Sequence, residues 1–158
     1  MHALPTLTPS QAWEKIKPYC AYQERCHAEV KSKLYDFGLT TPEVDQHLSR
    51  LIEENYLNEE RFAVHFAGGH FRLKKWGKVK IAYALKQRQV SAYCIKLALA
   101  QLPLDDYEAT LQRLAEAKWQ QVRQGTVAAR QAKIRSYLLQ KGFENTLISD
   151  ALRNLAEG

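Results

Sequence analysis

An internal repeat constrains the fold of this chain more than any other feature of its sequence. Three segments, residues 30–51, 81–102 and 134–155, align without a gap so that six apolar positions coincide. The aligned sets are Val30, Ile81 and Ile134; Leu34, Leu85 and Leu138; Leu39, Val90 and Phe143; Val44, Ile95 and Ile148; Leu48, Leu99 and Leu152; and Leu51, Leu102 and Leu155. This agreement indicates one structural unit that is used three times.

The spacing inside the segment predicts two short amphipathic helices. Apolar residues recur at i and i+4 before a break and at i, i+4 and i+7 after it, which is a helical periodicity. The break falls at Gly38, Gln89 and Gly142, and glycine tolerates the left-handed conformation that ends many helices. The expected N-caps of the helices after the break are Thr41 (before Pro42), Ser91 and Asn145.

Each pair of short helices follows a longer predicted helix, near residues 9–24, 59–75 and 105–124. Thr8 and Gln11 have the spacing of a capping box, while Asn58 and Asp105 mark the other two starts. No segment has the pattern of a buried strand. The expected fold is therefore all-α, with three tandem three-helix, helix-turn-helix-like repeats that form an elongated, curved modular rod. The expected boundaries are a tail at 1–8 and repeats at 9–57, 58–103 and 104–158.

Charge is segregated along the chain, whose net charge is +6. Residues 61–104 contain no Asp or Glu but carry nine cations, namely Arg61, Arg72, Lys74, Lys75, Lys78, Lys80, Lys86, Arg88 and Lys96. A second acid-free stretch, 117–143, contains Lys118, Arg123, Arg130, Lys133, Arg135 and Lys141. Such segregation favours a polyanion or an acidic protein surface as the partner over a merely solvated face, on which the signs would alternate.

Residues 71–80, FRLKKWGKVK, lie at the centre of the larger acid-free stretch. The candidate residues for binding a partner or DNA are Arg72, Lys74, Lys75, Trp76, Lys78, Lys80, Tyr83, Lys86 and Arg88. Trp76 either stacks on a base or packs between two helices. Gly77 would allow a close backbone approach, and the helix start after it would favour a phosphate or carboxylate. The third helix of each repeat lacks the exposed Arg, Asn and Gln that base reading requires.

Several other classes of function are not expected. The odd number of cysteines (Cys20, Cys26 and Cys94) predicts buried thiols rather than disulfides. His65 and His70 are too poorly spaced to share a helical face as metal ligands, and no nucleophile motif or phosphate-cradling loop is present. We therefore expect no catalytic residue, no metal and no cofactor. The lack of a long apolar run or a signal-peptide pattern predicts a cytoplasmic monomer without a membrane partner.

Two motifs carry a resemblance to a known family. Residues 56–63, YLNEERFA, and residues 75–81, KWGKVKI, resemble the core motif of the RecX family, and residues 25–34, RCHAEVKSKL, resemble the helix that precedes it. The resemblance extends over roughly residues 12–155. Asn58 stands where the family usually has Asp, Ala84 where Glu is common, and Arg88-Gln89 where Lys-Gly is typical.

The resemblance implies a regulator of the RecA recombinase that acts in recombination and DNA repair. RecX-like proteins bind the filament of RecA on single-stranded DNA, lie along its groove and usually inhibit its ATPase, strand exchange and growth; some also bind DNA themselves. The partner implied is RecA, with single-stranded DNA in direct contact in some members. A sequence-neutral DNA-binding module that acts alone is the alternative.

Overall fold

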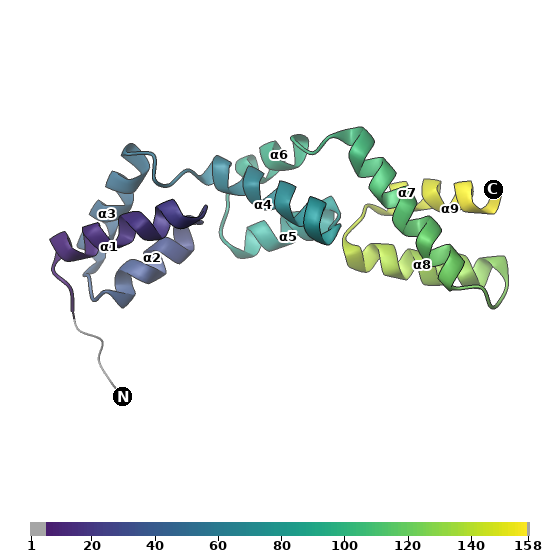
Figure 1. Cartoon of the computed structure of the whole chain (residues 1–158), viewed down its shortest axis with the longest axis horizontal. Helices are drawn as coiled ribbons and strands as arrows, with labels where there is room; N and C mark the ends of the chain where they lie inside the picture. Colours follow the sequence, from purple (N-terminus) through teal and green to yellow (C-terminus); the bar gives the residue numbers. More distant parts are fainter. Residues whose placement is uncertain (1–5, 158) are drawn as a thin grey trace, which may run out of the picture.

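The computed structural model describes residues 6–157, and all regular elements in that range are α-helices. The first group contains α1 (Pro9–Tyr22), α2 (His27–Asp36) and α3 (Thr41–Glu53); the second contains α4 (Glu59–Lys74), α5 (Lys78–Gln87) and α6 (Ala92–Ala100); the third contains α7 (Leu104–Gln121), α8 (Val127–Lys141) and α9 (Asn145–Glu157). The three groups follow one another along an elongated rod, with α1 and α9 at its opposite ends (Figure 1). The predicted all-α rod of three-helix repeats is confirmed, while residues 1–5 of the expected tail lie outside the described range.

The break between the second and third helix of each group has the same geometry in all three copies. Gly38, Gln89 and Gly142 are left-handed, with φ of 90°, 63° and 96°. In each copy the N–H of the following residue donates to the carbonyl five positions earlier, at 3.5 Å, 3.1 Å and 3.1 Å respectively. The predicted breaks are therefore confirmed, and Gln89 adopts the conformation that glycine adopts more readily.

Three of the six predicted helix starts are confirmed. Thr8 and Gln11 form the capping box of α1, the side chain of Asn58 caps α4, and the hydroxyl of Ser91 accepts from the N–H of Cys94 at 3.2 Å. The expected cap at Thr41 is wrong by one position. Thr40 is the N-cap of α3, because it is the residue at capping-box spacing from Glu43.

Two further starts differ from the prediction. The helix α7 begins at Leu104, after Pro103 and without a side-chain cap, so that Asp105 and Asp106 lie inside its first turn. Acidic residues in that position still stabilise the positive end of the helix. Asn145 is the first residue of α9, and its amide oxygen accepts a hydrogen bond from the Arg135 guanidinium.

The apolar positions of the repeat build two buried clusters. One belongs to the first group alone and contains Trp13, Ile16 and Leu51 among its buried residues. The other runs through the second and third groups and also includes Cys26 from the start of α2. Tyr107, which is fully buried, connects the two groups because its ring lies 5.6 Å from that of Phe71 and 5.4 Å from that of Phe143.

The boundaries 9–57, 58–103 and 104–158 remain a proposed division of the chain. All three cysteines are buried free thiols, as expected. None of the helices in the described range is long and apolar enough to cross a membrane.

A candidate polyanion-binding seam

The basic run 71–80 forms the joint between α4 and α5. The helix α4 ends at Lys74, and Lys75 takes a left-handed conformation, with φ of 59°. Its N–H and that of Trp76 donate to the carbonyls of Phe71 and His70, at 3.0 Å and 3.3 Å. Arg72 and Lys74 lie in the last turn of α4, where positive side chains stabilise the negative end of a helix. Part of this charge therefore serves the helix itself.

The end of α8 docks directly on the start of α5. The N–H of Gly77 donates to the carbonyl of Lys141 at 2.7 Å, and that of Val79 donates to the carbonyl of Gly142 at 2.9 Å. A Cβ atom added to Gly77 would lie 2.4 Å from the carbonyl carbon of Gly142, so only glycine permits this approach. The close backbone approach at Gly77 is thus made by α8 of the same chain, and the predicted approach of a partner stays a prediction. We call this contact between the second and third groups the seam.

The seam corrects one expectation about the start of α5. The positive start of this helix was expected to favour an external phosphate or carboxylate, but the carbonyl groups at the end of α8 already accept hydrogen bonds from the N–H groups of Gly77 and Val79. Two helix ends of opposite polarity thus satisfy each other. The N–H groups of Gly77 and Val79 are therefore already occupied by contacts within the chain.

Tyr107 holds the seam from the side of α7. Its hydroxyl accepts a hydrogen bond from the N–H of Lys78 at 2.9 Å and donates one to the carboxylate of Glu144. Burial, together with the bond to Glu144, raises the pKa of Tyr107. The Nζ atom of Lys78 lies 4.9 Å from the centre of the Tyr107 ring. Lys78 therefore contacts the buried side of the seam.

Four other ammonium groups collect around the seam, and we call them the seam cluster: Lys74, Lys75, Lys80 and Lys141. The Nζ atoms of Lys74 and Lys80 lie 5.4 Å and 4.7 Å from the centre of the Trp76 ring. Lys141 donates from Nζ to the carbonyl of Lys74 at 2.6 Å, which ties the third group to the second. Burial lowers the pKa of Lys141, and the nearby charges of Lys80 and Lys75 lower it further.

Among the described residues, no carboxylate forms an ion pair with this cluster. The five ion pairs between described residues involve Lys17, Arg25, Arg50, Arg61 and Arg153 as the cations. The seam cluster has no part in them, so its charge is available to a partner.

The remaining predicted residues lie apart from the cluster or have a structural contact of their own. Tyr83 is 65% exposed on α5, and Lys86 is exposed one turn later. Arg88 donates to the carbonyl of Ala84 at 2.9 Å, with its guanidinium 4.7 Å from the centre of the Phe66 ring. Arg72 is exposed on α4.

Trp76 packs between helices. Its half-buried ring lies against the core of the second and third groups, 4.6 Å from the ring of His70. The sequence left two roles open for Trp76, stacking on a base or packing between two helices, and the structure shows Trp76 packed between helices. The indole supports the ammonium groups of Lys74 and Lys80.

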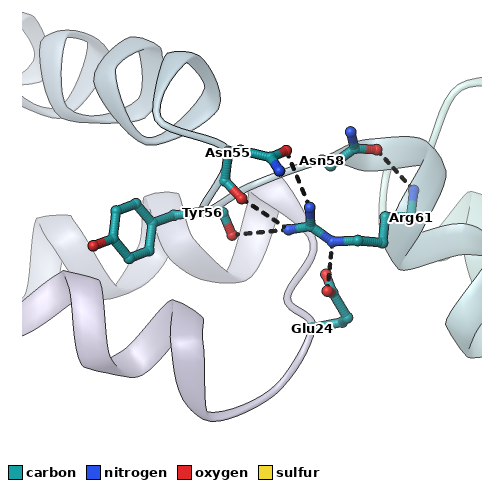
Figure 2. Close-up of polar contacts among 5 residues, drawn as sticks. All are labelled: Glu24, Asn55, Tyr56, Asn58 and Arg61. Atoms are coloured by element: carbon teal, nitrogen blue, oxygen red, sulfur yellow. Dashed lines mark hydrogen bonds and ion pairs between the residues drawn. The ribbon is translucent and has the colours of Figure 1, made fainter.

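Arg61 belongs to the acid-free stretch, but its guanidinium is engaged in hydrogen bonds that join parts of the structure (Figure 2). Its guanidinium donates to Glu24 at 2.5 Å, to the side chain and carbonyl of Asn55 at 3.1 Å and 3.2 Å, and to the carbonyl of Tyr56 at 3.4 Å. These contacts join the first group to the second. Arg61 is therefore a joint residue, and its charge is paired with Glu24.

Lys141 is the cluster member that the sequence-based candidate set lacks. Lys141 lies in the second acid-free stretch, 117–143, and this was the only feature of the sequence that marked it as a candidate binding residue. Lys141 is far from residues 71–80 along the chain, so the sequence does not predict that they meet. The docking of α8 on α5 brings Lys141 close to Lys74 and Lys80. In the described range, no group of three or more His, Cys, Asp or Glu side chains is placed to hold a metal ion.

Comparisons with known proteins agree on one family. A family model described as the second three-helix domain of RecX matches residues 58–99, and one described as the third three-helix domain of RecX matches residues 105–152. Together these two matches cover more than half of the chain.

Curated relatives match over most of the chain. It is 28% identical over 138 residues to "Regulatory protein RecX" of Prosthecochloris aestuarii, which covers 87% of this chain and 88% of that protein. It is 25% identical over 142 residues to the protein of that name from Geobacillus kaustophilus, which covers 90% of this chain and 53% of the relative. The chain thus spans about half the length of this and some other curated relatives.

Solved structures match the fold. The crystal structure of RecX from Lactobacillus salivarius superposes with a TM-score of 0.88 at 21% identity, over 95% of this chain and 97% of that one. A second crystal structure, of regulatory protein RecX, gives a TM-score of 0.80 at 21% identity. At this level of identity, the likeness concerns the arrangement of the helices.

Proposed function

The chain belongs to the RecX family, and from that premise we propose that it regulates the RecA recombinase by binding the RecA filament on single-stranded DNA. In this proposal the rod lies in the groove of the filament and spans more than one RecA subunit. It acts as a cytoplasmic monomer and has no catalytic chemistry of its own. The result is inhibition of the ATPase, strand exchange and filament growth.

The observation that carries the proposal is a set of unpaired cations fixed on a rod-shaped scaffold. The seam cluster has no carboxylate partner among the described residues, and it lies where two of the three groups meet. A filament of protein on DNA offers negative charge along its groove, from phosphates and from acidic side chains. An elongated ligand with cations near its middle matches that surface in both shape and charge.

Regulation by such a ligand needs only a difference in affinity. A protein that binds one state of the filament more tightly than another shifts assembly toward the state it prefers. Because one rod contacts several subunits, a few bound copies affect many subunits. This accounts for inhibition without a reaction at the binding site.

The unpaired cations also favour a second candidate, a DNA-binding module that acts without RecA. The two candidates differ in what co-sediments with the chain. At a salt concentration that abolishes binding to bare single-stranded DNA, a regulator still sediments with RecA–DNA filaments. A stand-alone DNA binder is released from both, because phosphate contacts weaken steeply as salt rises. Release from both at the same salt concentration would contradict the proposed function.

A further inference from the structure

We propose that the seam cluster is a phosphate-binding site for single-stranded nucleic acid that is complete only when α8 of the third group is docked on α5 of the second. The proposal rests on the proposed function in one respect, namely that the filament supplies the nucleic acid. It adds a binding residue from the third group, Lys141, and makes the joint itself part of the site.

The cations of the cluster come from both sides of the seam and are held in place there. Lys141 projects from the end of α8 and donates to the carbonyl of Lys74 at 2.6 Å. Lys80 reaches in the opposite direction, from α5 toward the carbonyl of Gln140 at 3.5 Å. Each group thus places a lysine over the other. The ammonium groups are pre-organised, which reduces the entropy that is lost when a ligand binds.

The cluster carries an electrostatic cost that an anion would remove. Burial lowers the pKa of Lys141, and repulsion from Lys80 and Lys75 lowers it further. No carboxylate among the described residues forms an ion pair with these side chains. A bound phosphate would attract all of them, so phosphate binding and docking of α8 on α5 strengthen each other.

A nucleic-acid strand fits this arrangement better than an acidic protein segment. A strand carries one negative charge at every nucleotide, so that it supplies closely spaced anions without the folding cost of gathering carboxylates. Tyr83 lies three residues after Lys80 on α5 and is 65% exposed, which offers a base a stacking surface. Trp76 is half-buried, and the ammonium groups of Lys74 and Lys80 already lie near its ring, so Tyr83 offers the freer aromatic surface.

The site depends on two glycines because they allow the docking. A Cβ atom on Gly142 would lie 2.2 Å from the Cβ of Lys80, and one on Gly77 would lie 2.4 Å from the carbonyl of Gly142. Either change pushes α8 away from α5. Lys141 would then move away from Lys74 and Lys80 although the charge of the chain is unchanged.

The first test measures the affinity of the full chain for a short fluorescein-labelled oligothymidylate by anisotropy, without RecA, over a series of salt concentrations. We expect Lys141→Gln to weaken binding about fivefold at 0.1 M salt and to reduce the salt slope by about 0.7, the value for one phosphate contact on a single strand. The matched control is Lys133→Gln, which removes an exposed lysine from the same helix. Equal effects of the two substitutions would overturn the proposal.

The second test separates geometry from charge. Gly142→Ala and Gly125→Ala both place alanine at a left-handed position of the third group, with φ of 96° and 99°, but an added Cβ at Gly125 meets only Ala129 at 3.5 Å. We expect oligothymidylate binding to fall with Gly142→Ala and to persist with Gly125→Ala, in samples whose helical content is matched by circular dichroism. Equal binding by the two variants would contradict the role of the seam.

Two outcomes distinguish this inference from the proposed function. If poly-glutamate competes as well as oligothymidylate at equal charge, the site takes an acidic protein surface, and the nucleic-acid inference fails while regulation of RecA stands. If the chain binds oligothymidylate through Lys141 but leaves RecA unaffected, the inference stands and the proposed function fails.

Discussion

Arg61 and Glu24 form the ion pair that ties the first three-helix group to the second, with Nε of Arg61 2.5 Å from Oε1 of Glu24 (Figure 2). The seam between the second and third groups is built differently, from backbone hydrogen bonds between α5 and α8 and from the buried ring of Tyr107. One joint thus depends on a partly exposed side chain and the other on close backbone contact. The rod therefore has two joints with different tolerance to substitution.

Replacing Arg61 loosens the first joint. We expect Arg61→Ala to lower the free energy of unfolding by about 1–2 kcal/mol, because several hydrogen bonds to a charged group are lost at a site that water partly screens. Amide exchange should accelerate at residues 23–26 and 55–58. The control is Arg72→Ala, which removes an exposed cation from the same helix. In a double-mutant cycle, Arg61→Ala and Glu24→Gln should be non-additive; additivity would mean that the pair is not coupled.

The hydroxyl of Tyr107 is the corresponding contact at the seam. We expect Tyr107→Phe to lower the free energy of unfolding by about 1–3 kcal/mol, because the N–H of Lys78 and the carboxylate of Glu144 lose a buried partner. Chemical denaturation measures the effect. Tyr83→Phe, at a side chain that is 65% exposed, should leave stability unchanged. An equal cost at both positions would refute this account of the seam.

The fold was largely predictable because its signal is local. Helical periodicity, breaks at Gly38, Gln89 and Gly142, and caps at Thr8, Asn58 and Ser91 are properties of neighbouring residues. The misplaced caps at Thr41, Asp105 and Asn145 are errors of one or two residues. In the case of Thr41, two adjacent threonines compete, and the spacing to Glu43 decides for Thr40.

The site was predictable only in part, because contacts between groups are not local. The sequence locates Lys74, Lys75 and Lys80 by their density of charge, but it does not reveal that α8 docks on the start of α5. That contact occupies the N–H groups of Gly77 and Val79 and adds Lys141 to the cluster. The density of charge in the sequence also does not distinguish Arg61 from the seam cluster. Arg61 is held by Glu24 and backbone carbonyls, whereas the cluster forms no ion pair among the described residues.

Gln89 offers a stabilising substitution. It occupies a left-handed position, with φ of 63°, where the other two groups have glycine. We expect Gln89→Gly to raise the free energy of unfolding by about 0.5–1 kcal/mol, since a side chain in this conformation costs about 1 kcal/mol. Ala82→Gly, in the middle of α5, should instead destabilise by a similar amount. A loss of stability in Gln89→Gly would show that the left-handed residue is not strained.

Ser91 couples stability to pH through Glu59. Burial raises the pKa of Glu59, but hydrogen bonds from Ser91 and Cys94 outweigh it and leave the pKa below its usual value. The Ser91 hydroxyl donates to Glu59 at 2.6 Å while it caps α6. Because the folded pKa is the lower one, this contact contributes stability above the unfolded pKa of about 4.3 and loses it as pH falls through the folded pKa.

The predicted effect of Ser91→Ala is therefore pH-dependent. We expect it to lower the free energy of unfolding by about 1–2 kcal/mol near neutral pH, from the lost cap and the lost bond to Glu59, and by less in acid. Thr126 caps α8 through the N–H of Ala129, and its hydroxyl donates to no carboxylate within residues 6–157. Thr126→Ala should cost the same at both pH values. A parallel pH profile for the two variants would rule out the link to Glu59.

The lysines of residues 74–80 should matter for binding to the filament. We expect alanine at Lys74, Lys75, Lys78 and Lys80 to weaken binding to RecA–DNA filaments by at least roughly tenfold and to flatten its salt dependence, with helical content retained. A control with alanine at Lys15, Lys31, Lys96 and Lys133, all exposed, removes the same charge elsewhere. Equal loss in both variants would mean that net charge alone accounts for the binding.

The rate of ATP hydrolysis by RecA on single-stranded DNA shows whether the chain regulates RecA through the lysines of residues 74–80. The chain is added in amounts far below the RecA concentration, with the four-lysine variant at residues 74–80 and its charge-matched control in parallel. The account predicts a lower rate with the native chain and the control, and a rate close to that of RecA alone with the variant. An unchanged rate at every ratio of native chain to RecA would contradict it.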